Sequence, residues 1–139
     1  MKKLLLYILA SFVIFYNTSA QSSVVVVVAK NSTIEALDLN QVANIFLART
    51  NRFPNGEKST PVEFVYGNSR EEFYVNISGK NTKQLMAYWT TLIFTGKGRP
   101  PKGYKELEQL MDALPLKLNY ITYLDSSLVT EDMKVVFRF

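Results

Sequence analysis

The sequence predicts an α/β fold, in which strands and helices alternate along one domain. Residues 24–28 are five consecutive valines, which is typical of a strand buried on both faces in a parallel sheet covered by helices. Residues 82–94 place apolar side chains at helical spacing. The other apolar segments continue the alternation, with no internal repeat and no low-complexity linker. This order favours helices layered against a sheet.

Residues 1–20 have the pattern of a cleavable secretory signal peptide. Two lysines precede an apolar run at 4–15, and small residues lead to a cleavage site after Ala20. The run is shorter than the roughly 20 residues that a membrane-spanning helix needs. We therefore expect residues 21–139 to be one exported domain with no membrane insertion after cleavage. An uncleaved N-terminal anchor is the alternative, because Thr18 is an imperfect partner for Ala20 in such a site.

The composition narrows the chemistry, because the chain contains no Cys and no His. Thiol nucleophiles, Ser-His triads, imidazole acid/base catalysis and the usual zinc sites are excluded. The carboxylates form no paired constellation, and no loop has the Asp/Asn alternation of a calcium site. We expect no catalytic residues, no metal and no cofactor. The net charge of +4 comes without a dense basic stripe, so nucleic acid is not an expected partner.

The first half of the domain contains two predicted strands and two predicted helices. After the valine strand, residues 38–47 form a helix with Asp38 or Asn40 as N-cap and its apolar residues on one face. Residues 49–60 form a loop around the turn signal Pro-Asn-Gly. Residues 61–66 are a second strand. A helix then covers the chain from Arg70 to Ile77, with its apolar residues inward.

The second half begins with the clearest helix, residues 82–94. Its expected buried face is formed by side chains at i, i+4, i+7 and i+8, namely Leu85, Trp89, Leu92 and Ile93. A basic loop rich in Gly and Pro follows at 95–103. A further helix is predicted at 104–113, and strands at 118–124 and 133–139.

One connection between a strand and a helix is a candidate anion site. Gly67, Asn68, Ser69 and Arg70 combine a flexible backbone, a hydroxyl and a guanidinium at a helix start, where free N–H groups attract small anions. The structural alternative is a plain helix cap with Ser69 as the N-cap residue. The loop at 95–99 lacks the spacing of a nucleotide-binding loop and follows a helix, so it is interpreted as a connection.

Several motifs occur together in a familiar order. They are residues 44–47, 52–56, 61–62, 69–74, 78–80, 84–89 and 93–101. With the valine strand, this order resembles the short, single-module members of the phosphate ABC transporter substrate-binding protein family, in the type 2 periplasmic binding protein superfamily. The resemblance covers residues 24–139. Its most specific parts are Ala-Tyr-Trp at 87–89 and Ile-Phe-Thr-Gly-Lys-Gly-Arg-Pro-Pro at 93–101.

The resemblance implies a single three-layer-like lobe in the periplasm, with a mixed sheet flanked by helices. It implies inorganic phosphate or a similar small anion as ligand, and an ABC permease or another envelope protein as partner. In the two-lobed binders the anion lies between a loop after the first strand and a helix start. The corresponding residues here are Asn31, Ser32 and Thr33 for the loop, and Gly67, Asn68, Ser69 and Arg70 for the helix start.

The chain departs from the family pattern in length and in sequence. Two lobes that close on a ligand need about twice this length, so one lobe offers at most a half-site. The Pro-Gly-Ala-Ile-Gly-Tyr stretch of the family is Pro-Leu-Lys-Leu-Asn-Tyr at 115–120, without its glycines. The alternative function is therefore an envelope interaction module that has kept the fold and lost the ligand site.

Overall fold

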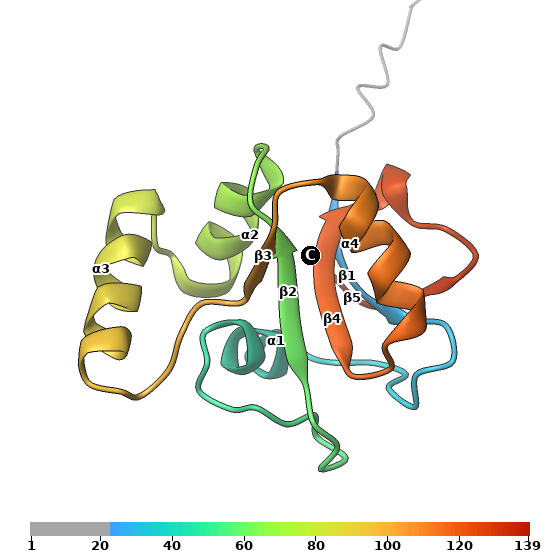
Figure 1. Cartoon of the computed structure of the whole chain (residues 1–139), viewed down its shortest axis with the longest axis horizontal. Helices are drawn as coiled ribbons and strands as arrows, with labels where there is room; N and C mark the ends of the chain where they lie inside the picture. The colour runs from blue at the N-terminus through green and yellow to red at the C-terminus, as the bar shows by residue number, and fades with distance from the viewer. Residues whose placement is uncertain (1–22) are drawn as a thin grey trace, which may run out of the picture.

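The computed structural model describes residues 23–139 (Figure 1), so the predicted signal peptide lies outside the described residues. Five strands form one sheet in the order β3-β2-β4-β1-β5. Their bounds are Val24–Ala29 for β1, Thr60–Phe64 for β2, Lys102–Tyr104 for β3, Tyr120–Asp125 for β4 and Met133–Arg138 for β5. Within the described part of the chain, no helix is long and apolar enough to cross a membrane.

The valine strand β1 lies inside the sheet and is buried along its whole length. It runs antiparallel to both neighbours, β4 and β5, so the expectation of a parallel strand is wrong. The parallel pairs are those of β2 with β3 and with β4. Burial on both faces follows from the helices that cover the sheet, and those helices bury a strand whichever way it runs.

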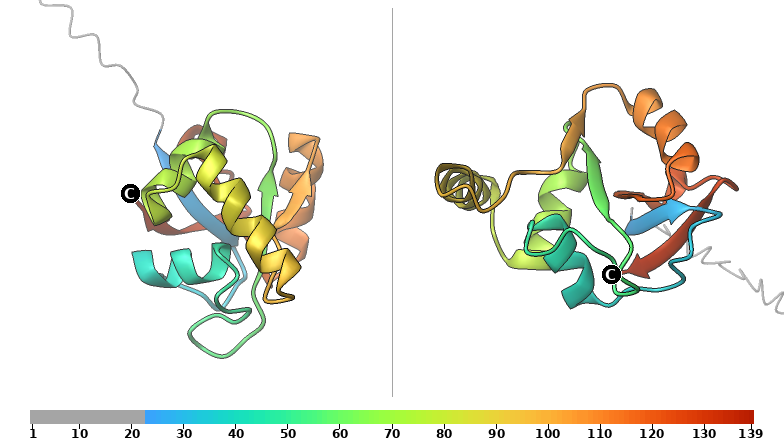
Figure 2. Two further views of the ribbon diagram at one scale, coloured as in Figure 1. Left: turned by 90° about the vertical axis from the view of Figure 1, so that its left-hand side faces the viewer. Right: turned by 60° about the horizontal axis from the view of Figure 1, so that its bottom comes forward.

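The helices cover both faces of the sheet and produce three layers. Three helices belong to one side: α1 (Leu39–Phe46), α2 (Ser69–Ser78) and α3 (Thr82–Phe94). Helix α4 (Leu107–Ala113), continued by the 3-10 turn Leu114–Leu116, covers the other side (Figure 2). Alternate valines of β1 enter the two cores, Val26 in the first and Val27 in the second. A second 3-10 turn, Ser126–Leu128, follows β4.

Helix boundaries follow local signals closely. Asp38 caps α1 and Asn81 caps α3, each in a capping box. The cap side chain accepts a hydrogen bond from the backbone N–H three residues later, and the glutamine side chain there accepts one from the backbone N–H of the cap residue. Gly79, with φ of 67°, ends α2 in the left-handed conformation. The helix predicted at 104–113 begins only at Leu107, because Tyr104 belongs to β3, a strand that the sequence pattern did not predict.

Helix α3 buries a narrower face than its apolar spacing predicts. Leu85 and Trp89 are buried and Leu92 is half-buried, but Ile93 is 56 % exposed. In Figure 2 the helix stands at the side of the molecule and does not lie across the sheet. A helix at this position contacts the domain along one stripe only, so the last apolar residues of its predicted face remain in solvent.

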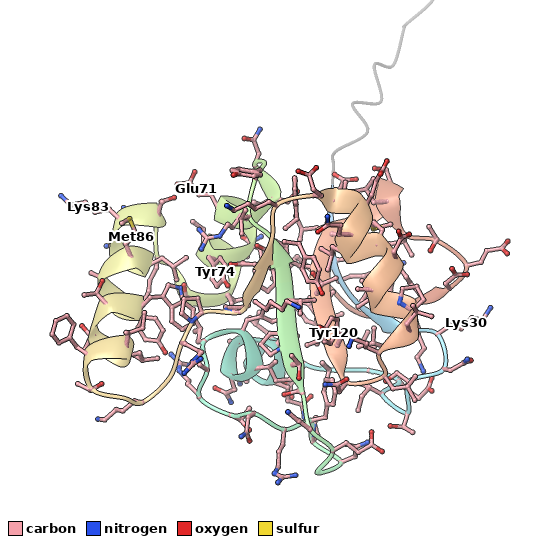
Figure 3. All side chains as sticks on the ribbon, viewed as in Figure 1. Lys30, Glu71, Tyr74, Lys83, Met86 and Tyr120 are labelled. Carbon is pink, nitrogen blue, oxygen red and sulfur yellow. The ribbon has the colours of Figure 1, made fainter. Side chains whose placement is uncertain are left out.

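Two neighbouring residues of α3 provide a test of this packing. Leu85→Ala should lower the free energy of unfolding by about 2–5 kcal/mol, because Leu85 is 2 % exposed and its removal leaves a cavity in the core. Met86→Ala is the matched control, since Met86 is 67 % exposed and lies on the outer side of α3 in Figure 3, so a change within about 0.5 kcal/mol is expected. Urea denaturation measures both. Equal losses in the two variants would contradict the packing of α3.

Candidate functional site

A buried carboxylate lies beneath the start of α2. Glu63 of β2 is 2 % exposed. Its Oε2 accepts hydrogen bonds from the hydroxyls of Tyr123 at 2.7 Å and Tyr74 at 3.1 Å. Its Oε1 accepts a bond from Nε of Arg70 at 3.4 Å. A buried carboxylate needs such partners, because an unpaired charge in the interior costs several kcal/mol. The network therefore fixes α2 against β2 and β4.

The two phenols of this network remain protonated at ordinary pH. Burial raises the pKa of Tyr74 well above its usual value, and the negative charge of Glu63 raises it further. Burial likewise raises the pKa of Tyr123, with the Glu63 charge as the second cause. Both hydroxyls therefore act as hydrogen-bond donors to the carboxylate.

The start of α2 carries the four residues of the predicted helix-start segment. Gly67 has a φ of 95°, which a glycine adopts without strain. The helix begins at Ser69, and Asn68 occupies the N-cap position without a side-chain cap hydrogen bond. The interpretation of Ser69 as N-cap is therefore wrong by one residue. Since Asn68 does not cap them, the first N–H groups of α2 are suited to an anionic ligand.

A small cavity of about 130 Å³ opens beside this helix start. Gly67, Ser69 and Arg70 line it on one side. Its other lining residues come from β2, β4, α4 and the segments next to them, and most are apolar or aromatic: Phe64, Tyr66, Leu107, Tyr123, Leu124 and Leu128. Asp125 at the end of β4 lines it as well and brings one carboxylate to the cavity, which opposes the attraction of Arg70 for an anion. The cavity is large enough for one small anion and too small for a nucleotide.

Arg70 pairs with a buried glutamate and not with the two glutamates that follow it in the sequence. Glu71 and Glu72 lie in the first turn of α2 and are exposed. The ion-pair partner of Arg70 is the buried Glu63, which precedes the helix. The guanidinium also lies over the ring of Tyr74, 5.3 Å from its centroid, and the Arg70 side chain keeps 26 % of its surface exposed. Arg70 is thus oriented by the network and still reaches the surface.

The other predicted segment makes different contacts. Asn31 is exposed, and Ser32 is buried with its hydroxyl accepting a bond from the backbone N–H of Ile34. Thr33 donates a hydrogen bond to the carboxylate of Glu57 at 2.8 Å. Asn31 lines a separate cavity to which Glu131 and Asp132 contribute two carboxylates and Lys30 one cation, so the charges there are on balance unfavourable for an anion.

The structure does not bring the two predicted segments together. Strand β1 is antiparallel to β4, and β4 is parallel to β2. The residues that follow β1 therefore lie at the end of the sheet where β2 begins, whereas the start of α2 lies where β2 ends. In Figure 3, Lys30 and Glu71 mark these two positions on opposite sides of the molecule. One small anion within this domain cannot contact both segments.

Glu63 and Tyr123 were not among the residues that the sequence pattern singled out. The signal for Glu63 was a lone glutamate inside the apolar stretch 61–66. Such a residue on a buried strand requires buried partners. Tyr123 carries no comparable signal, because a tyrosine in a strand is ordinary.

No family model matches the chain, and no curated protein matches it in sequence. Solved structures do share its fold. A candidate phosphate ABC transporter substrate-binding protein from Clostridium perfringens, with bound phosphate, has a TM-score of 0.60 at 14% identity. An ABC-type phosphate transport receptor from Vibrio cholerae has a TM-score of 0.62 at 9% identity. A candidate phosphate-binding protein from Planctomyces limnophilus has a TM-score of 0.60 at 14% identity.

These similarities cover 82% of this chain in each case, but only 44%, 45% and 40% of the three proteins in that order. The chain therefore spans less than half the length of each. The described domain has the fold of one part of these binding proteins. The expected α/β lobe, with a mixed sheet flanked by helices, is confirmed as its fold.

The buried phenols predict an alkaline loss of stability. Because folding raises the pKa of Tyr74 and Tyr123 above the usual value of 10.0, the contribution of these two groups to stability is constant below about pH 10 and falls above it, where only the unfolded chain releases these protons. Tyr123→Phe should make this fall shallower and should lower the free energy of unfolding at pH 7 by about 1–3 kcal/mol. Denaturant unfolding between pH 7 and about pH 11 measures both effects.

Tyr66→Phe is the control for this experiment, because Tyr66 is 58 % exposed. Its free energy of unfolding should match that of the unmodified protein at each pH. An alkaline slope unchanged by Tyr123→Phe would contradict the role assigned to the buried phenol.

Proposed function

We propose that this protein binds phosphate or a similar small oxyanion at the start of α2, as a periplasmic component of ABC-type uptake. The observation that carries the proposal is the helix start without a side-chain cap, next to Arg70 and a cavity of about 130 Å³. Backbone N–H groups at a helix start and a guanidinium are both suited to oxyanions. Support also comes from the fold, which is shared with proteins described as phosphate binders.

Residues 67–70 supply the binding groups in this proposal. The first N–H groups of α2 would donate to the anion, with the hydroxyl of Ser69 as a further donor. A guanidinium has five N–H donors, and the bond to Glu63 occupies the Nε donor of Arg70. Glu63 thereby orients Arg70 without using its whole donor set.

A single lobe should bind weakly. The cavity is open to solvent in this single lobe, so an anion there remains partly hydrated and its hydrogen bonds gain less. Tight binding would require a covering surface from another protein, for which a transport permease is the natural candidate.

The ion pair between Arg70 and Glu63 favours a second candidate function. A guanidinium held by a buried carboxylate is partly neutralised before any anion arrives. An envelope interaction module would keep this pair as a structural element and use its surface for a protein partner.

Calorimetric titration of the purified protein with phosphate, and separately with sulfate, tests the proposal. We expect weak binding that Ser69→Ala reduces and that Arg70→Gln reduces by roughly tenfold or more, since a hydrogen bond to a charged group is lost. Lys83→Gln is the control, because Lys83 is exposed on α3, away from the cavity. Thermal unfolding of each variant separates a loss of binding from a loss of folding.

Absence of heat and of thermal stabilisation at millimolar phosphate would contradict the proposal. In that case, the interaction module would be supported if this protein captured an envelope protein and if its Ser69→Ala and Arg70→Gln variants captured the same partner.

A further inference from the structure

A second and larger cavity lies at the other end of β2. Its volume is about 640 Å³. Three segments enclose it: residues 48–51 after α1, residues 58–61 leading into β2, and residues 97–102 between α3 and β3. In Figure 1 the connection from α3 to β3 runs beside the loop that follows α1. We call this cavity the basic groove.

The charges that line the basic groove all have one sign. Its charged lining residues are Arg49, Lys58, Lys97, Arg99 and Lys102, and no Asp or Glu lines it. Each of these five side chains is exposed. Like charges raise one another's free energy, and a multivalent anion would relieve that repulsion.

An unsatisfied hydroxyl lies in the same groove. Ser59 lines the groove and is 3 % exposed, yet its Oγ has no hydrogen-bond partner among the described residues. Its backbone N–H is bonded to the carbonyl of Asn51, so the residue is held in place. A buried hydroxyl without a partner costs about 1–3 kcal/mol, so an oxyanion that reached the Ser59 Oγ from the groove would supply the missing acceptor.

Close backbone contacts hold the walls of the groove in position. A Cβ on Gly98 would lie 3.1 Å from the Cβ of Ala48 and 3.2 Å from Leu92, so a side chain there would require these neighbours to shift by a few tenths of an ångström. Ala48 itself has a φ of 57°, which is uncommon for a residue with a side chain. Pro100 and Pro101 limit the backbone freedom of the third segment. The cations are therefore attached to a backbone that is already ordered for binding.

We propose that the basic groove binds a multivalent oxyanion, a compound carrying two or more linked phosphate groups. Its cations come from three segments, so one phosphate would meet only part of the set, whereas a chain of phosphates could meet groups on facing walls. The site is distinct from the start of α2. Thr60 and Pro61 place the groove where β2 begins, and α2 starts beyond the end of β2.

Titration of the purified protein with orthophosphate, pyrophosphate and tripolyphosphate tests this assignment. We expect affinity at the groove to rise along this series and to fall as NaCl is added. The double variant Lys97→Gln/Arg99→Gln should weaken tripolyphosphate binding roughly tenfold. Ser59→Ala should weaken it by a smaller factor without loss of thermal stability, because it removes an unpartnered hydroxyl.

The control is the double variant Lys30→Gln/Lys83→Gln, which removes the same net charge at residues that do not line the groove. It should bind tripolyphosphate within about twofold of the unmodified protein, since distant exposed charges are screened. Equal weakening in the two double variants would overturn the proposal, and so would an affinity for orthophosphate equal to that for tripolyphosphate.

Two further measurements distinguish the groove from the site at α2 and from a membrane-binding surface. Arg70→Gln should leave tripolyphosphate binding intact, so failure of the site at α2 and failure of the groove are distinguishable. Vesicles of equimolar phosphatidylcholine and phosphatidylglycerol test a lipid source of the same chemistry. Binding to these vesicles without binding of free tripolyphosphate would overturn the groove as a site for a soluble ligand.

Discussion

The arrangement of this domain depends on satisfying one buried carboxylate, that of Glu63. Two of its hydrogen-bond partners come from α2, the next element along the chain, and the third comes from β4, which is distant in sequence and meets β2 only in the folded chain. The aromatic rings around it reinforce the same contact, since Phe73 stacks on Tyr123 with centroids 4.0 Å apart. Because a buried charge without partners is strongly unfavourable, the network restricts α2 to one position and one rotation.

This restriction has a consequence for the chemistry at the start of α2. Residues at the start of the helix line a small cavity, and Arg70, already oriented by Glu63, lines the same cavity. The carboxylate therefore organises the donors, although it also competes with an incoming anion for the same guanidinium. The affinity and selectivity of such a site for anions depend on what covers it, because a half-open cavity leaves a bound anion partly hydrated.

The two ends of β2 differ in character. At the end of β2, the cavity beside α2 is small and partly apolar, and one guanidinium lines it. At the start of β2, the basic groove is several times larger, and cations from three segments line it. A single sheet thus separates two places that carry cationic side chains, which suit ligands of different size and charge. Asn31 lies at the same end of the sheet as the start of β2, but it lines a cavity with two carboxylates. Position along the sheet therefore does not by itself make an anion site.

The sequence by itself determined the local elements, and the tertiary structure decided how they meet. Capping residues such as Asp38 and Asn81 and the terminal Gly79 act over a few residues, so the ends of α1, α2 and α3 were predictable to within a residue or two. The direction of β1, the short strand β3 and the bond between Tyr123 and Glu63 depend on pairings between distant segments, which no local pattern encodes. For the same reason the sequence could propose residues 31–33 and 67–70 as anion-binding segments but could not show that strand direction places them at opposite ends of the sheet.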